Sequence, residues 1–219
     1  MEEDDSGGSA PCFAHELVGG FAVDQETWRD VRRFRVSERA RLYARRKELT
    51  QDERAAQSAA VAAGLDTLLP ESAGKVVAGY WPIRGELDLR DWMGRAHVSG
   101  ARLALPVVLE KGQPVEFRAW APGAAMERGI WNILVPAEGE ALLPDVVIVP
   151  LVGLDRDLYR LGNGGGYYDM TIAACDPRPR LIGVGQDFCR ISTIFPQPWD
   201  IPMDCAVLGD VTVSGADGG

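Results

Sequence analysis

The chain has 219 residues, of which 46% are hydrophobic and 25% charged, and its formal net charge is -9. This composition is typical of a globular domain with one sizeable core. The acidic balance argues against a nucleic-acid partner, because phosphate backbones are bound by an excess of Lys and Arg. No apolar run approaches the ~20 residues that cross a bilayer, and the acidic start at 1–5 lacks the basic region of a signal peptide. We expect a cytoplasmic protein without a membrane partner, as a monomer or weak homo-oligomer.

The four cysteines are widely scattered and contain no C-x-x-C pair. Reduced thiols fit this spacing better than a disulfide framework or a zinc site, so we expect no structural metal. Cys12 and His15 form a C-x-x-H pair, but the pair lacks the two further ligands that a zinc site needs. The acidic, Gly/Ser-rich start has nothing to bury. We expect a disordered leader and extension at 1–25, an α/β domain at 26–213 and a flexible tail at 214–219.

Two helices are expected to open the domain. Apolar residues recur at helical spacing among Arg and Glu from 27 to 47, and a break is expected near Val36. Thr50 and Glu53 have the S/T-x-x-E form of a capping box, which predicts a second helix over 50–69. The arginine run of the first helix is either a solvated face or a place where an anion is bound.

Strands and helices are expected to alternate after residue 74. The apolar run at 145–150 is the strongest signal of a buried strand, and it leads directly into a glycine-rich loop and a short helix. A strand, loop and helix in this order place ligands at the carboxyl edge of an open α/β sheet. The predicted strands are 75–81, 102–108, 115–120, 145–150, 180–184 and a last segment at 205–213, and the predicted helices are 87–98 and 167–174.

The glycine-rich loop at 160–169 holds four glycines in five positions, from Gly162 to Gly166. Glycine allows positive φ and lets backbone N–H groups approach a ligand, so this loop suits phosphate oxygens. The guanidinium of Arg160 can donate charged hydrogen bonds to the same anion, and Asp169 is a suitable carboxylate ligand for Mg²⁺. The alternative is a flexible turn whose aspartate only caps the helix. The loop matches neither the P-loop pattern nor the G-x-G-x-x-G dinucleotide pattern.

Together with residues on either side, this loop resembles the 5-formyltetrahydrofolate cyclo-ligase family, whose members are also called methenyltetrahydrofolate synthetases. The resemblance runs from about 35 to 213. It implies a single three-layer α/β domain with a mostly parallel central sheet and N-terminal helices, a kind of sheet that also carries isomerases and CoA transferases. The matching positions are Tyr80, Pro82, Glu86, Pro106, Gly129, Ile130, Trp131, Asn132, Pro136, Val149, Pro150, Asp155, the loop at 160–169, Asp200, Ile201, Pro202, Met203 and Asp204.

The resemblance implies ATP and Mg²⁺ as cofactors and 5-formyltetrahydrofolate as the substrate. It makes Arg160 and Tyr168 catalytic and assigns the metal ion to Asp169 and Asp200. The implied folate-binding residues are Trp81, Glu86, Trp131 and Tyr168. The implied ATP-binding residues are Arg35, Arg39, Arg160, Leu161, Gly162, Asn163, Gly164, Gly165, Gly166, Tyr167 and Tyr168. Taken singly, Glu86 is also explained as a helix cap at Leu87, Trp131 as a core residue and Asp200 as part of a turn.

The implied reaction needs ATP because the formamide oxygen on N5 is a poor leaving group. Phosphorylation gives an iminophosphate, N10 attacks it to close the ring, and phosphate leaves. The products are 5,10-methenyltetrahydrofolate, ADP and phosphate. The protein has to position two substrates, neutralise the charge on the moving phosphoryl group and keep water away from the intermediate.

Three positions depart from the family pattern. Leu158 stands where relatives usually have glycine, Met170 where they usually have arginine, and Cys189 where they often have glutamine. A chain that kept the pocket and lost turnover would be a folate- or nucleotide-binding regulator, which is the main alternative function. An isomerase or acyl transferase on the same kind of sheet is the other alternative, because fold alone does not fix a reaction.

Overall fold

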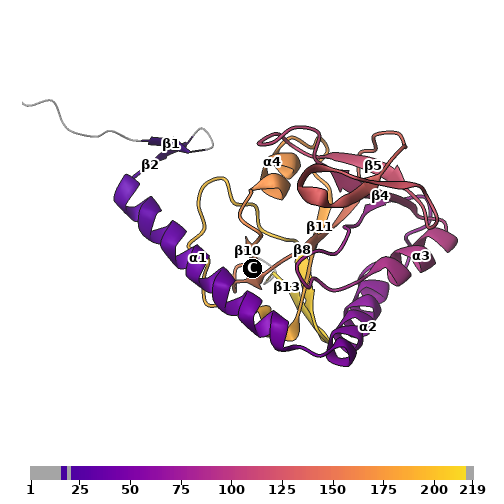
Figure 1. Ribbon diagram of the computed structural model, residues 1–219, viewed down its shortest axis with the longest axis horizontal. Coiled ribbons are helices and arrows are strands. Elements are labelled where there is room, and N and C mark those ends of the chain that lie inside the picture. The colour runs from indigo at the N-terminus through magenta and orange to yellow at the C-terminus, as the bar shows by residue number, and fades with distance from the viewer. Residues whose placement is uncertain (1–15, 19–20, 216–219) are drawn as a thin grey trace, which may run out of the picture.

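The computed structural model describes residues 16–18 and 21–215 (Figure 1). A seven-stranded sheet forms its centre, in the order β13 (Val211–Ser214), β12 (Cys205–Leu208), β11 (Arg180–Gly185), β8 (Val146–Pro150), β3 (Val76–Ala78), β4 (Arg102–Val107) and β5 (Glu116–Trp120). The strands from β12 to β4 are parallel to one another, and β13 and β5 add antiparallel edges. The predicted mostly parallel sheet is confirmed.

The sheet is covered on both faces because its central strands are apolar on both sides. In β8, Val146 and Ile148 belong to one core cluster, whereas Val147 and Val149 belong to a second. Successive side chains of a strand point to opposite faces, so one continuous apolar run builds two cores at once. This arrangement gives the three layers that the family resemblance implies.

Helices supply the outer layers. α2 (Gln51–Leu68) and α3 (Arg90–Val98) pack into the first cluster, and α4 (Tyr167–Ala173) contributes Ile172 to the second. Gly64 lets α2 lie close to β12, because a Cβ at this position would be only 2.6 Å from a side-chain carbon of Val207. The predicted capping box of α2 is confirmed: Glu53 N donates to Thr50 Oγ1 at 3.2 Å and Thr50 N donates to the Glu53 carboxylate at 2.8 Å.

The longest helix, α1 (Gln25–Glu48), runs along the outside of the domain in Figure 1, and its N-terminal part extends past the sheet. Its Leu42 is buried in a small third cluster with Leu161 and Ile194. The helix is continuous, so the predicted break near Val36 is wrong. A β-branched residue in a helix costs only a fraction of a kcal/mol, and the exposed Val36 does not interrupt the turn.

An antiparallel hairpin precedes α1. It consists of β1 (Glu16–Val18) and β2 (Phe21–Val23), within the stretch expected to be an irregular extension. That expectation is corrected for these residues, whose strands of three residues are too short to give a clear alternating pattern. The C-x-x-H pair and the rest of the acidic leader lie outside the described residues, as do 216–219.

The remaining differences from the predicted elements are local. The last apolar segment, predicted at 205–213, does close one edge of the sheet, as the hairpin of β12 and β13 that turns at Gly209 with φ of 59°. Two further small hairpins were not predicted: β6 (Met126–Arg128) with β7 (Leu134–Pro136), and β9 (Gly153–Leu154) with β10 (Arg160–Leu161).

The expected thiol state holds for the cysteines that the structure describes, since Cys175, Cys189 and Cys205 are all free. Across residues 16–18 and 21–215, no helix is both long enough and apolar enough to span a membrane.

Candidate functional site

A cavity of about 840 Å³ opens at the carboxyl edge of the sheet. Its wall includes residues that end or directly follow the parallel strands, such as Tyr80 after β3, Pro106 in β4 and Pro150 of β8. Ligands of open α/β sheets bind at this edge. Every site residue that the sequence predicts lines this one cavity. We call the part near Trp28, Arg35, Trp199 and Asp200 the α1 end, and the part near Tyr80, Glu86 and Tyr168 the Glu86 end.

The glycine-rich loop connects β10 to α4 and reaches both ends of the cavity. Gly164 and Gly166 have φ of 101° and 68°, in the left-handed region that side chains disfavour. At Gly165, a Cβ would lie 2.7 Å from the Tyr167 ring, so only glycine fits between the ring and the backbone. Residues 163–166 are exposed, which leaves their backbone accessible from the cavity.

Two arginines of α1 contact this region in different ways. Arg39 Nε donates to the carbonyl of Gly162 at 2.7 Å, and its guanidinium carbon lies 3.5 Å from the position a Cβ would take at Gly164. Burial and the neighbouring Arg35 lower the pKa of Arg39. Arg35 is itself buried and donates to the carbonyls of Ile194 and Phe195 and to the carboxylate of Asp200.

Arg160 and Asp169 form a bidentate ion pair beside the loop. Arg160 Nη1 and Nη2 donate to the two carboxylate oxygens of Asp169 at 3.1 and 2.8 Å, with the side chains only 5% and 15% exposed. The third nitrogen of this guanidinium, Nε, is buried and has no hydrogen-bond partner among the described residues. It lies 3.8 Å from the position that a Cβ would take at Gly162. A buried charged donor without a partner, beside an open glycine loop, suits an anion.

The two predicted metal ligands, Asp169 and Asp200, line the same cavity. Burial raises the pKa of Asp169, and the negative charge of Asp200 raises it further, whereas Arg160 and the backbone N–H of Ile201 lower it. Asp200 also accepts from Gln197 N at 2.6 Å. Within the described residues, no group of three or more His, Cys, Asp or Glu side chains gathers to hold a metal ion.

A chain of hydrogen bonds joins the glycine-rich loop to the Glu86 end. Asn163 Nδ2 donates to Glu86 Oε1 at 3.2 Å, while Asn163 Oδ1 accepts from the Tyr43 hydroxyl of α1. The other Glu86 oxygen accepts from Ile83 N at 3.0 Å. Burial raises the pKa of Glu86, although these hydrogen bonds and the charges of Arg46 and Arg84 lower it. The helix-cap interpretation of Glu86 is wrong, since α3 begins only at Arg90.

Aromatic rings complete the cavity wall. Trp131 is 54% exposed, has φ of 56°, and meets the Tyr167 ring edge-on at 5.2 Å, so it is not a core residue. Tyr167 is held in turn by Gly112 N, which donates to its hydroxyl at 3.0 Å. Trp81 is partly buried against Trp120. The ring of Tyr168 lies under Arg160, 5.4 Å from the guanidinium carbon, and burial together with Glu86 raises the pKa of its hydroxyl.

Comparison with known proteins identifies the family. The model of the 5-formyltetrahydrofolate cyclo-ligase family matches residues 31–209. The chain belongs to this family. It is 29% identical over 179 residues to the 5-formyltetrahydrofolate cyclo-ligase of Mycolicibacterium smegmatis, covering 75% of this chain and 88% of that one. It is 28% identical over 171 residues to the enzyme of the same name from Escherichia coli K12, covering 74% and 93%.

The fold agrees with a solved cyclo-ligase-family structure. The 5,10-methenyltetrahydrofolate synthetase of Aquifex aeolicus superposes with a TM-score of 0.73 at 29% identity, over 84% of this chain and 94% of that one. The family match begins at residue 31 and therefore excludes the β1–β2 hairpin and the first turns of α1.

The departures from the family pattern have local explanations in two cases. Leu158 adopts φ of 64°, in the left-handed region that favours the glycine implied here by the family resemblance. Its side chain is only 4% exposed and packs in the second core cluster, so burial offsets the backbone strain. Cys189 is fully buried beneath Gln186, and burial raises its pKa to about 11, which excludes it from reacting as a thiolate near neutral pH. Nothing in the structure explains Met170.

Several residues of the cavity wall are absent from the sequence-based prediction, among them Trp28, Arg32, Arg84 and Trp199. Trp28, Arg32, Arg35 and Arg39 follow one another at intervals of four, three and four residues, which places them on one face of α1. This spacing is visible in the sequence, but the sequence-based prediction assigns a ligand only to the arginines of this helix face. Trp199 gives no such signal, because it lies in an irregular segment.

Proposed function

We propose that this chain catalyses the ATP-dependent cyclisation of 5-formyltetrahydrofolate to 5,10-methenyltetrahydrofolate, with release of ADP and phosphate. The observation that carries the proposal is that one cavity joins an open glycine loop, two arginine-held carboxylates and a buried glutamate bordered by aromatic rings. The family match and the similarity to cyclo-ligases and a synthetase of the same reaction support it.

The chemical steps assign simple tasks to the protein. The formyl oxygen on N5 attacks the γ-phosphorus of ATP, and ADP leaves. N10 then attacks the formyl carbon of the resulting iminophosphate, the bond from that carbon to the phosphorylated oxygen breaks, and N10 loses its proton. The protein aligns the two substrates and disperses the negative charge on the transferring phosphoryl group.

ATP phosphates fit the glycine-rich loop and the arginines around it. The backbone of 163–166 is open to the cavity, and Arg160 Nε is a charged donor that no described residue satisfies. Arg39 is held against Gly162, from where it can share its remaining donors with a phosphate oxygen. We propose that these groups hold the triphosphate while Tyr168 forms a wall that limits access of water.

Asp169 and Asp200 fit a magnesium ion, because Mg²⁺ in phosphoryl-transfer sites is commonly held by one or two carboxylates, phosphate oxygens and water. The bound ion would neutralise charge on the phosphate oxygens. Each carboxylate is fixed by an arginine, Asp169 by Arg160 and Asp200 by Arg35, so both keep their positions without the ion. We propose these two residues as its protein ligands.

The folate is assigned to the Glu86 end. A buried carboxyl group held by Ile83 N and Asn163 presents an acceptor for the N–H groups of a pterin ring, and Trp131 and Trp81 offer flat apolar surfaces for it. We also propose a cytoplasmic location for the protein. The free thiols of Cys175, Cys189 and Cys205 support it, because thiols of extracellular proteins are usually oxidised.

A spectroscopic assay tests the proposed function. Purified protein incubated with 5-formyltetrahydrofolate should form the methenyl product and ADP in equal amounts when MgATP is present. No product should form when ATP is omitted or magnesium is removed by a chelator. Tight binding of both substrates by a folded protein without product would instead support the folate- or nucleotide-binding regulator. Turnover without ATP would contradict both functions.

A further inference from the structure

The α1 end of the cavity contains a feature outside the part of the chain that matches the family. Trp28 precedes the family match at 31–209, yet its ring lines the cavity together with Trp199. The two ring centroids are 5.1 Å apart and the rings are perpendicular. Phe21 of the β1–β2 hairpin also contacts Trp199, with ring centroids 6.1 Å apart.

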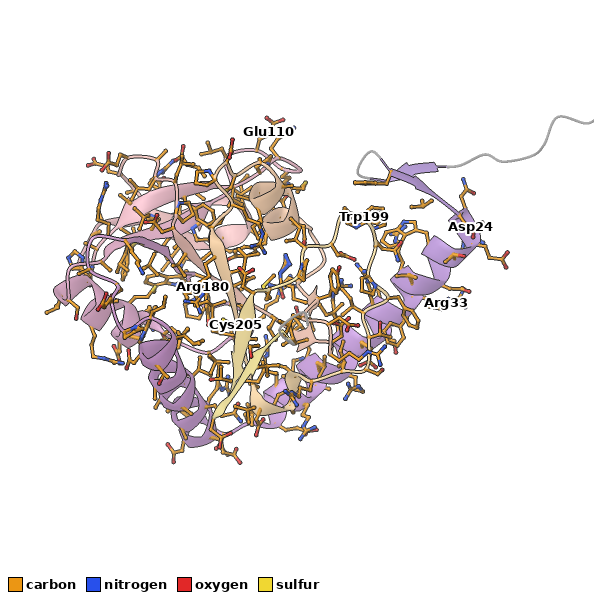
Figure 2. All side chains as sticks on the ribbon, turned by 180° about the vertical axis from the view of Figure 1, so that it is seen from behind. Asp24, Arg33, Glu110, Arg180, Trp199 and Cys205 are labelled. Atoms are coloured by element: carbon orange, nitrogen blue, oxygen red, sulfur yellow. The ribbon has the colours of Figure 1, made fainter. Side chains whose placement is uncertain are left out.

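These contacts hold the two tryptophans in place from several elements. The guanidinium of Arg35 lies 6.0 Å from the Trp28 ring, and the same guanidinium is bonded to Asp200, the neighbour of Trp199. Figure 2 shows Trp199 on the side of the domain that faces the N-terminal part of α1. Both rings are partly exposed and border a cavity, so each keeps aromatic surface available to a ligand.

The side chains on α1 run in a fixed order from the glycine-rich loop to this aromatic corner. Arg39 contacts the loop, Arg35 and Arg32 follow, and Trp28 comes last. Eleven residues of helix separate Arg39 from Trp28, which corresponds to about 16 Å along the axis. The row thus pairs positive charge near the loop with a flat apolar surface at the far end.

A nucleoside triphosphate has the same order of chemistry. If the proposed function holds, the γ-phosphate must lie near the folate at the Glu86 end, and the base lies at the opposite end of the nucleotide. Aromatic side chains bind purine bases by stacking, whatever the base's hydrogen-bonding edge. The p-aminobenzoyl ring of the folate is a less suitable occupant, because it is bonded directly to the N10 that must react beside the phosphate.

We propose that Trp28 and Trp199 form an aromatic wall that binds the purine base of ATP. The assignment rests on the proposed function and extends it to a part of this chain that the family match leaves out. The β1–β2 hairpin supports this wall through Phe21, which gives the N-terminal extension a role in nucleotide binding.

Titration calorimetry with two ligands tests the wall. MgATP has a base, whereas magnesium tripolyphosphate presents a similar polyphosphate without one. For Trp28→Ala we expect the affinity for MgATP to fall roughly fivefold to a hundredfold, as for the loss of one stacking contact, with the affinity for tripolyphosphate unchanged. Trp28→Phe should retain most of the MgATP affinity, which separates the loss of stacking from misfolding of α1.

Phe34→Ala is the matched control. Phe34 is also an aromatic residue of α1, packs on Phe195 at 5.0 Å, and is absent from the cavity wall, so its loss should leave both affinities unchanged. Equal losses of both ligands in Trp28→Ala, or a loss of 5-formyltetrahydrofolate binding alone, would overturn the wall but leave the proposed function intact. A wild-type protein that binds neither phosphate ligand would contradict the proposed function and the wall with it.

Discussion

The two ends of the cavity hold their carboxyl groups in contrasting ways. At the α1 end and beside the loop, Asp200 and Asp169 are each paired with a buried arginine. At the other end, Glu86 forms no ion pair with any described residue and is held by hydrogen bonds from Ile83 N and Asn163. Burial raises the pKa of both Asp169 and Glu86, but the charge of Arg160 is the main factor that lowers it at Asp169, whereas hydrogen bonds are the main ones at Glu86.

This difference matches the two kinds of ligand that the reaction needs. Fixed charges of both signs suit a polyphosphate with its metal ion, because the protein is already ordered before the ligand arrives. A buried carboxyl group that is hydrogen-bonded but not ion-paired within the described residues suits an uncharged ring that donates hydrogen bonds. The glycine-rich loop contacts both regions, so Asn163 is the place where they meet.

The largest effect is expected from breaking the buried pair. Arg160→Ala leaves the Asp169 carboxylate buried without its partner, which should lower the free energy of unfolding by about 3–5 kcal/mol. Turnover efficiency should also fall roughly tenfold to a hundredfold, because a charged hydrogen bond is lost. Urea denaturation and steady-state kinetics measure the two quantities.

The double variant Arg160→Ala with Asp169→Ala should recover part of the lost stability, since no charge remains unpaired. Arg95→Ala is the matched control on the surface. Its pair with Asp66 is 58% exposed on each side, so the change in stability should stay within about 1 kcal/mol. An Arg160→Ala protein as stable as the control would show that the pair is not tightly buried.

An intermediate effect is expected where the two ends meet. Asn163→Ala removes the link from Glu86 to the loop and from Tyr43 to the loop. The KM values for 5-formyltetrahydrofolate and for MgATP should both rise roughly twofold to tenfold, as for one or two neutral hydrogen bonds. Tyr43→Phe removes only the second bond and should raise the KM for MgATP alone. A change confined to the folate KM in both variants would disprove the bridging role.

The smallest effect is expected in the pH dependence of stability. The folded-state pKa of Glu86 lies above its ordinary value of 4.5, so the folded chain binds this proton more tightly than the unfolded chain does. The stability that this proton contributes is present below the unfolded pKa and is lost as the pH rises through the folded pKa. Glu86→Gln cannot lose a proton. Its unfolding free energy should therefore improve relative to wild type as the pH rises above 4.5, as measured by urea denaturation. A constant difference would contradict the direction of the shift.

The sequence predicts most of the sheet because its signals are local. The apolar run at 145–150 identifies β8, and the pair of Thr50 and Glu53 marks the start of α2, since each depends only on neighbouring residues. The residue types of the glycine-rich loop likewise predict an open phosphate-type loop. Roles carried over from the family resemblance then name a set of residues that do gather around one cavity.

The partners of the charged residues could not be predicted in the same way. The pairing of Arg35 with Asp200 joins residues 165 positions apart. The pairing of Arg160 with Asp169 competes with any contact that either side chain makes to a ligand. Such pairs depend on how the loops fold back over the sheet, which no periodic pattern records. The aromatic corner was missed for the same reason, because Trp28 finds Trp199 only after the segment at 195–200 is placed.

The continuity of α1 has a mechanical consequence. Its C-terminal half is anchored by Leu42 in the third cluster and by Arg46, whose Nη2 donates to the carbonyl of Leu151 at 2.9 Å. From Leu42, Arg39 is about 4.5 Å away along the axis and Trp28 about 21 Å. A small pivot of the rigid rod about its anchor would thus displace the aromatic corner several times farther than the arginine at the loop. Such a rotation would therefore disturb contacts between Arg39 and a polyphosphate less than contacts between Trp28 and a ligand.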